Sequence, residues 1–210
     1  IRISNFVCFP AFIVVLVLAT PISTLIYNAP GAGPAVWACS FSIVLLGLHQ
    51  VSTGVLQGLG HPTIPMVNMI LAAVAKVVLN WELTALPWLG IMGAAWATAA
   101  DMGVAAIINL IFIYKFIGYR MEIPQLLKTI AAAAVMAAAV YFCYDWTMAW
   151  WHIGVLSTFG SVFFGCAVYI AVMLLIGGLL EDDLQRMPMI GRIMIKFLRR
   201  IGVFKTSENQ

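Results

Sequence analysis

Long apolar stretches alternate with short breaker-rich or charged segments along the whole chain. A helix of about 20 mostly apolar residues is long enough to cross the hydrocarbon core of a bilayer. Dividing the chain at its Pro, Gly and charged clusters predicts six helices of this length. The predicted ranges are 5–27, 35–58, 63–85, 92–115, 125–144 and 153–180. This pattern predicts an all-α integral membrane protein with six transmembrane helices.

The last segment, residues 184–210, has a different pattern. Its apolar residues recur at helical spacing, and Arg and Lys residues lie between them. A helix with one apolar and one basic face lies in the membrane interface and binds anionic headgroups. We therefore expect a C-terminal amphipathic interfacial helix on the cytoplasmic leaflet, with anionic membrane lipids as its partners. The alternative is a polar tail whose periodicity arose by chance.

Composition supports the membrane prediction and excludes several other classes. Apolar residues make up 63% of the chain and charged residues 9%, against about 45–50% and about 25% in soluble domains. No charged residue lies between Arg2 and Lys76. So few charges cannot cover a water-exposed surface, which excludes a soluble enzyme, a nucleic-acid-binding protein and a disordered chain. Because Ile1 already lies in an apolar run, we expect the chain to be the C-terminal part of a longer protein.

Catalytic and ligand-binding motifs are absent from the sequence. It contains no phosphate-binding loop, no His-Glu-x-x-His segment and no Gly-x-Ser-x-Gly segment. The four Cys residues are isolated within apolar stretches, so neither a metal site nor a disulfide is expected. The sequence therefore predicts no enzyme activity, no catalytic residue, no metal and no cofactor.

The basic residues gather on one side of the predicted helices. With six crossings, the N-terminus, the second and fourth loops and the tail share that side. Ten of the eleven Lys and Arg residues fall there, and the remaining one, Lys76, lies inside a helix. Since cytoplasmic segments carry an excess of Lys and Arg, both termini are predicted to be cytoplasmic.

Lys76 and Asp101 are the most informative polar residues within the helices. They lie about a dozen residues on either side of the same turn, so both are roughly 18 Å from it on adjacent antiparallel helices. An unpaired charge at such a depth costs about 2.5–3.5 kcal/mol, and pairing recovers much of that cost. We expect an ion pair. It either only joins the two helices, or faces a cavity and meets an anionic substrate or responds to protonation.

Other polar residues form a stripe on each of three consecutive helices. The stripes comprise Ser42, His49, Thr53 and Gln57 on the second helix, with Gln50 beside them, Asn68, Lys76 and Asn80 on the third, and Asp101 and Asn109 on the fourth. Polar side chains inside a membrane either form hydrogen bonds between helices or line a hydrated cavity. Three neighbouring stripes favour a substrate cavity, although for His49 taken alone a structural role is favoured. On the last helix, Ser161 and Gly165 have the spacing of a small-residue packing motif.

A continuous segment from Gly47 to Pro62 carries a recognisable motif. Its text, Gly47-Leu-His-Gln-Val-Ser-Thr-Gly-Val-Leu-Gln-Gly-Leu-Gly-His-Pro62, is similar to the ST-x-LQGLG-x-P segment of bacterial polysaccharide and lipid II flippases. The segments 64–68, 76–80 (Lys-Val-Val-Leu-Asn) and 93–98 resemble the two helices that follow it in those proteins. Over roughly residues 5–145, the chain thus resembles the stage V sporulation protein B group of the multidrug/oligosaccharidyl-lipid/polysaccharide exporter superfamily.

This resemblance implies a transporter of two six-helix lobes and two appended helices. Residues 1–120 would be the last four helices of the second lobe, 121–183 the two appended transmembrane helices, and 184–210 a cytoplasmic amphipathic tail. The family moves undecaprenyl-linked sugars or peptidoglycan precursors across the bacterial cytoplasmic membrane by alternating access, without ATP. The implied partners are this lipid-linked sugar and the N-terminal lobe of the same protein.

Three other functions stay open at the level of the sequence. A cation-coupled multidrug exporter of the same superfamily would need an acidic cavity, for which only Asp101 is available. A membrane acyl- or glycosyltransferase would need a His or Asp near the interface, where His61, His152 and Asp145 lie without a motif. A non-transporting membrane scaffold is compatible with the same composition.

Overall fold

The computed structural model describes residues 2–119, 122–151 and 154–177, and within these ranges the regular structure is entirely helical. The helices are α1 (Arg2–Val17), α2 (Ala19–Tyr27), the short 3-10 helix η1 (Pro30–Ala32), α3 (Gly33–Gly58), α4 (Thr63–Ala85), α5 (Ile91–Ile117), α6 (Ile123–Trp151) and α7 (Gly154–Leu175). Five helices, α3 to α7, are long and apolar enough to cross a membrane, and the bent pair α1–α2 is the sixth candidate. The predicted all-α membrane architecture is confirmed. The predicted tail helix lies outside the described residues.

The first predicted helix, 5–27, is not continuous. It is broken at Leu18, where α1 and α2 meet at a bend of 75°. Pro21 has no N–H with which to bond the Val17 carbonyl, and its ring crowds the preceding turn, so the helix is weakened at this point. The bend is tolerated because Pro21 falls in the first turn of α2, where backbone N–H groups have no intrahelical partner in any case.

A second proline, Pro10, lies inside α1 without breaking it. Pro10 cannot donate to the carbonyl of Phe6, which is four residues earlier. The hydroxyl of Tyr169 on α7 donates to this carbonyl instead, over 3.1 Å. In a bilayer a freed backbone carbonyl must find such a partner within the protein, because no water is available.

Helix α6, the fifth predicted membrane helix, is longer than the sequence pattern indicated. The predicted helix 125–144 was followed by a loop over 145–152, whereas α6 continues to Trp151. No Gly or Pro lies between Asp145 and Trp151, and the Thr147 hydroxyl donates to the Cys143 carbonyl within the helix. Asp145 therefore lies in the last turns of a helix and not in a loop.

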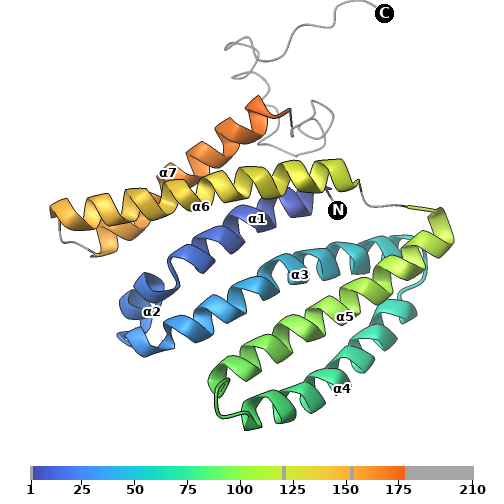
Figure 1. The fold of residues 1–210 in the computed structure, drawn as a ribbon. Helices are drawn as coiled ribbons and strands as arrows, with labels where there is room; N and C mark the ends of the chain where they lie inside the picture. The colour runs from blue at the N-terminus through green and yellow to red at the C-terminus, as the bar shows by residue number, and fades with distance from the viewer. Residues whose placement is uncertain (1, 120–121, 152–153, 178–210) are drawn as a thin grey trace, which may run out of the picture.

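The helices are neighbours in the order α4, α5, α3, α1, α6 and α7. Figure 1 shows α4, α5 and α3 lying side by side, with α1 beside α3 and the pair α6–α7 beyond α1. Helix α5 is thus enclosed between α3 and α4, whereas α4 is at the edge of the described bundle. This arrangement brings the three predicted polar stripes onto adjacent helices.

The apolar core lies where α1, α6 and α7 meet. Its largest buried side chains include Leu18, Met136, Val140 and Tyr169. Gly165 of α7 packs so closely on Val140 that a Cβ atom there would clash. The small-residue motif of the last helix, formed by Gly165 with the buried Ser161, therefore does what its spacing predicted and lets α6 and α7 approach.

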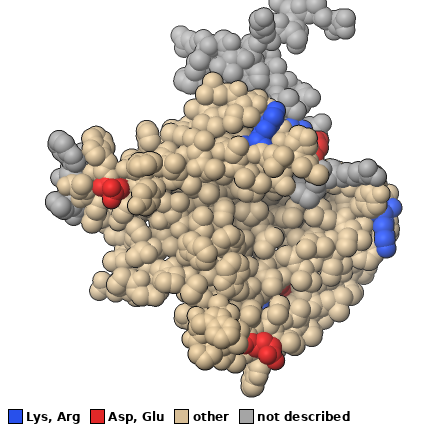
Figure 2. Space-filling view, in the orientation of Figure 1, with Lys and Arg blue, Asp and Glu red and all other residues tan. Residues whose placement is uncertain are grey.

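The two ends of the bundle differ in charge. At one end, Arg2 Nη1 lies 3.3 Å from Glu122 Oε2, and Lys128 Nζ donates to the Gly177 carbonyl over 3.2 Å. This end of the bundle is therefore formed by the start of α1, the start of α6 and the end of α7. In Figure 2 blue patches lie at the top and right of the visible face, a small red patch lies beside the upper blue one, and further red patches lie at the left and bottom, with a broad, mostly uncharged surface between. Such a surface suits the hydrocarbon region of a bilayer.

Candidate functional site: a polar seam between α3, α4 and α5

Helices α4 and α5 pack against each other in a regular register, and polar residues meet at their contact with α3. We call this contact region of α3, α4 and α5 the polar seam. Asn68 Nδ2 donates to Asn109 Oδ1 over 2.8 Å, and Lys76 Nζ lies 3.7 Å from Asp101 Oδ2. The two pairs are separated by eight residues on each helix, so the antiparallel helices keep one register over roughly 12 Å. The structure therefore brings together the two charges that the sequence placed at equal depth.

Small residues make this close approach possible. Gly93 lies a further eight residues before Asp101, and a Cβ on Gly93 would be 2.5 Å from the carbonyl of Leu83 on α4. Between the polar positions, Ala97 and Ala105 are 0% and 2% exposed. Small side chains at every fourth position let two membrane helices pack with their backbones close together. This packing fixes the depth at which the polar pairs meet.

The Lys76–Asp101 pair is unevenly shielded. The Asp101 side chain is 13% exposed, whereas the Lys76 side chain is 39% exposed. Their separation of 3.7 Å is within ion-pair range but longer than a charge-assisted hydrogen bond. Because an ammonium group has three donors, Lys76 can bind a second anionic group while it stays near Asp101.

A buried hydrogen-bonded network joins all three helices. Asn109, which is 0% exposed, accepts from Asn68 and donates to Ser52 Oγ over 3.3 Å and to Thr53 Oγ1 over 3.1 Å. Ser52 in turn donates to the carbonyl of His49. For Thr53 and Asn68 these bonds favour the helix-joining role that the sequence left as one of two alternatives.

His49 is also buried, but it is not part of this network through its ring. The residue is 6% exposed, and its Nδ1 atom has no hydrogen-bond partner among the described residues. A buried polar atom without a partner costs about 1–3 kcal/mol.

Three other predicted site residues point outward, whereas Ser42 is half-buried and donates to the Cys39 carbonyl within α3. Gln50 and Gln57 on α3 and Asn80 on α4 are exposed on the described bundle. Each residue turns a helix by 100°, so the eight residues from His49 to Gln57 rotate the side chain by about 80°. The stripe therefore divides into a buried part and an exposed part. Exposed amides within a membrane-spanning helix need water or a polar partner.

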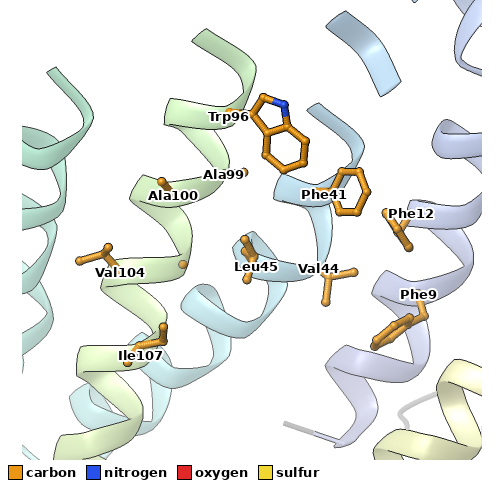
Figure 3. Close-up of a pocket in the computed structure, with 11 residues that line it drawn as sticks. Phe9, Phe12, Phe41, Val44, Leu45, Trp96, Ala99, Ala100, Val104 and Ile107 are labelled. Atoms are coloured by element: carbon orange, nitrogen blue, oxygen red, sulfur yellow. The ribbon is translucent and has the colours of Figure 1, made fainter. Parts of the chain in front are cut away.

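A wide apolar groove lies between α1, α3 and α5, away from these polar groups (Figure 3). Its volume is about 640 Å³. It is lined by Phe9, Phe12, Phe41, Val44, Leu45, Trp96, Ala99, Ala100, Gly103, Val104 and Ile107. Phe41 and Gln50 are nine residues apart, which places the groove and the exposed amide half a turn apart on α3. None of the predicted site residues lines this groove.

Ser52 and Tyr169 make structural hydrogen bonds but are not among the site residues predicted from the sequence. Ser52 is 0% exposed and lies three residues after His49 and four before the fully buried Leu56. This spacing is the signal that would have placed it on the buried face. Tyr169 gives no such signal, because its role depends on the carbonyl freed by Pro10. Among the described residues, no group of three His, Cys, Asp or Glu side chains could hold a metal ion.

Two curated proteins of Bacillus subtilis (strain 168) are similar to the chain. The uncharacterized membrane protein YabM is 30% identical over 187 residues, which are 86% of the chain and 34% of YabM. Stage V sporulation protein B is 23% identical over 189 residues, which are 88% of the chain and 35% of that protein. The chain thus spans about a third of the length of these curated relatives. No family model and no solved structure matches it. The chain is therefore a multi-pass membrane protein and, over most of its length, a distant homologue of stage V sporulation protein B and YabM.

Proposed function

We propose that the chain is part of a flippase or exporter that moves a lipid-linked oligosaccharide or peptidoglycan precursor across the bacterial cytoplasmic membrane. The lipid is of the undecaprenyl type, and transport proceeds by alternating access without ATP hydrolysis. The homology to stage V sporulation protein B and the motif at residues 47–62 support this proposal. Because the matched region is about a third of each relative, the second wall of the cavity would come from another lobe of a longer protein.

The observation that carries the proposal is the half-exposed Lys76 inside a membrane-spanning helix. A charge at this depth is expensive and is seldom kept without a function. The Asp101 carboxylate partly neutralises the Lys76 ammonium. Because the Lys76 side chain is 39% exposed, its ammonium can also bind the phosphate groups of a lipid-linked sugar. The exposed amides Gln50, Gln57 and Asn80 could then hydrogen bond to the polar head of the substrate.

The same pair argues against the cation-coupled drug exporter. Such a transporter needs a carboxylate that is free to bind a cation within the membrane. Asp101 is already paired with Lys76, and the other acidic residues in the described ranges, Glu82, Glu122 and Asp145, lie in or beside the end turns of helices. We propose in addition that the end with Arg2, Lys115 and Lys128 is cytoplasmic, because basic residues are retained on that side.

Transport by the complete protein in vesicles tests this function. The vesicles contain a fluorescent lipid-linked sugar and no ATP. Dye in the inner leaflet is protected from a reagent added outside, and it should lose this protection when the wild-type protein is present. Lys76→Met and Asp101→Asn should each lower expression or transport. The double variant Lys76→Met/Asp101→Leu should recover expression but not transport, because an apolar pair packs well and cannot bind phosphate.

Lys115→Met is the matched control, since Lys115 lies in the last turn of α5, where its Nζ is 5.8 Å from the centre of the Phe112 ring. This variant should transport at the wild-type rate. Wild-type rates in both single variants at the seam would refute the proposed role of the pair. A wild-type protein that leaves the lipid-linked sugar in place would refute the flippase and favour the scaffold.

A further inference from the structure

The end of α4 carries an open pocket that is separate from the Lys76–Asp101 pair. Its volume is about 470 Å³, and it is lined by Val77, Asn80, Trp81, Thr84 and Ala85. None of these five side chains is charged. The pocket lies beside the turn between α4 and α5, which Figure 1 shows at the far end of α5 from the start of α6. It is therefore remote from the basic end of the bundle.

A polar stripe on α4 connects this pocket to the polar seam. Lys76, Asn80 and Thr84 follow one another at intervals of four residues, so they lie along one side of the helix at steps of about 6 Å. The Lys76 side chain is 39% exposed, and Asn80 and Thr84 are exposed as well. A ligand whose anionic group binds Lys76 can therefore extend past Asn80 into the pocket, over about 12 Å.

The pocket offers both hydrogen-bond donors and hydrogen-bond acceptors. The side-chain amide of Asn80 makes no hydrogen bond within the described ranges, so its two donors and its oxygen are available. The Thr84 hydroxyl donates to the backbone carbonyl of Asn80, which leaves the hydroxyl oxygen as an acceptor. Polar groups without partners are costly in hydrocarbon. This side of α4 is therefore suited to water or a polar ligand and not to lipid tails.

Trp81 adds an aromatic surface beside these polar groups. Its side chain is 79% exposed, and its indole stacks on no other ring in the part of the chain that the structure describes. The face of an aromatic ring is electron-rich and attracts the weakly positive C–H bonds of a sugar ring, while amides and hydroxyls bind the sugar hydroxyls. An apolar tail would leave the Asn80 amide without a partner, and an anion would find no positive charge in the pocket. The chemistry of the pocket thus fits a neutral saccharide.

We propose that this pocket, the Trp81 pocket, binds a sugar ring of the substrate while Lys76 binds its phosphate. That the sugar belongs to a lipid-linked saccharide rests on the proposed function. A lipid pyrophosphate that carries no sugar makes only the contact with Lys76. The two sites together therefore distinguish the loaded lipid carrier from the empty one.

Trp88 provides a matched control for Trp81. Trp residues also gather at membrane interfaces, where they anchor helices without binding a ligand. Trp88 is 76% exposed in the turn that follows α4, and it does not line the pocket. A role as an interfacial anchor applies to both residues, whereas a role in sugar binding applies to Trp81 alone.

The test is a competition between two lipids for the complete protein in mixed micelles. Undecaprenyl pyrophosphate with and without one N-acetylglucosamine is added in equal amounts, and native mass spectrometry separates the two complexes by mass. The ratio of the complexes measures the preference for the sugar and does not depend on the amount of folded protein. The wild type should prefer the sugar-bearing lipid by about 2–10-fold, the factor expected for one stacked ring.

Variants assign this preference to the pocket. Trp81→Leu should abolish most of the preference, and Trp81→Phe should retain part of it because Phe keeps an aromatic face. Asn80→Leu should also lower the ratio, because it removes the amide that binds sugar hydroxyls. Trp88→Leu should leave the ratio unchanged. Lys76→Met should weaken the binding of both lipids equally, so that the ratio stays at the wild-type value.

Two results overturn the Trp81 pocket. The first is a wild-type protein without a preference for the sugar. The second is a preference that survives Trp81→Leu or that falls equally in Trp88→Leu. The competition does not require transport. A protein that shows the stated preference but does not move a lipid-linked sugar would refute the proposed function and leave the pocket in place, whereas transport with an unchanged ratio in Trp81→Leu would do the reverse.

Discussion

Replacing Asn109 with Leu removes the centre of the buried network that joins α3, α4 and α5. Asn109 is fully buried, accepts one hydrogen bond from Asn68, and donates one each to Ser52 and Thr53. Leu keeps the branching at Cγ and has neither a donor nor an acceptor. The change in the free energy of unfolding therefore reports mainly on the three hydrogen bonds and on the partners that lose them.

The expected size follows from the number of bonds. A hydrogen bond between membrane helices contributes about 0.6 kcal/mol on average and about 1.7 kcal/mol at most. Asn109→Leu breaks three bonds and should cost about 2 kcal/mol. Asn68→Leu breaks one and should cost about 0.6 kcal/mol. Asn80→Leu, which replaces an exposed amide on the same helix as Asn68, should change stability by less than about 0.5 kcal/mol.

The assay is unfolding of the reconstituted complete protein in mixed micelles with increasing sodium dodecyl sulfate, followed by tryptophan fluorescence. The three variants are compared with the wild type under identical lipid and detergent conditions. The loss of stability should be largest for Asn109→Leu, smaller for Asn68→Leu and smallest for Asn80→Leu. Equal losses for Asn109→Leu and Asn68→Leu would show that the bonds from Asn109 to α3 contribute nothing and that the network is not a single unit.

Three further predictions concern the packing, the orientation and the tail. In the same assay, Gly93→Ala should cost about 1–3 kcal/mol because its Cβ meets the α4 backbone, whereas Gly54→Ala, with open space around it, should stabilise α3 by up to about 1 kcal/mol. In intact cells, an impermeant maleimide should label a Cys at Ala32 and not one at Leu59, and the reverse pattern would contradict the cytoplasmic assignment of the basic end. A peptide of residues 186–205 should become helical on anionic vesicles and stay unordered in buffer, and equal binding to neutral vesicles would show that its basic residues contribute nothing.

The depth of a residue within the membrane could be predicted from the sequence, because it depends only on the number of residues between that residue and the end of its helix. Lys76 and Asp101 lie equally far from one turn, and two antiparallel helices joined by a short turn must bring such positions to the same level. The same arithmetic applies to Asn68 and Asn109, and both pairs meet in the structure. The direction in which each side chain points around the helix axis was less predictable. Positions four residues apart rotate progressively around the axis, so Gln57 no longer lies on the same face as His49.

The bend in the first span could not be predicted from its prolines alone. The span contains Pro10 and Pro21, and each removes one hydrogen bond from the helix. Only the second position breaks, because at the first one a tyrosine from a distant part of the chain supplies the lost hydrogen bond. Which proline bends the helix is therefore decided by tertiary contacts, which a single sequence does not display.

The bond between Tyr169 and the Phe6 carbonyl makes positions 10 and 169 interdependent during evolution. With proline at position 10, Tyr169→Phe leaves a carbonyl without a partner in a dry interior, so this substitution is harmful. With alanine at position 10, the helix bonds that carbonyl itself, and the hydroxyl of Tyr169 becomes the group without a partner. The two substitutions should therefore be tolerated together better than either is alone, as expected for residues that share one hydrogen bond. An alignment of relatives that includes this region would then show the two positions changing as a pair.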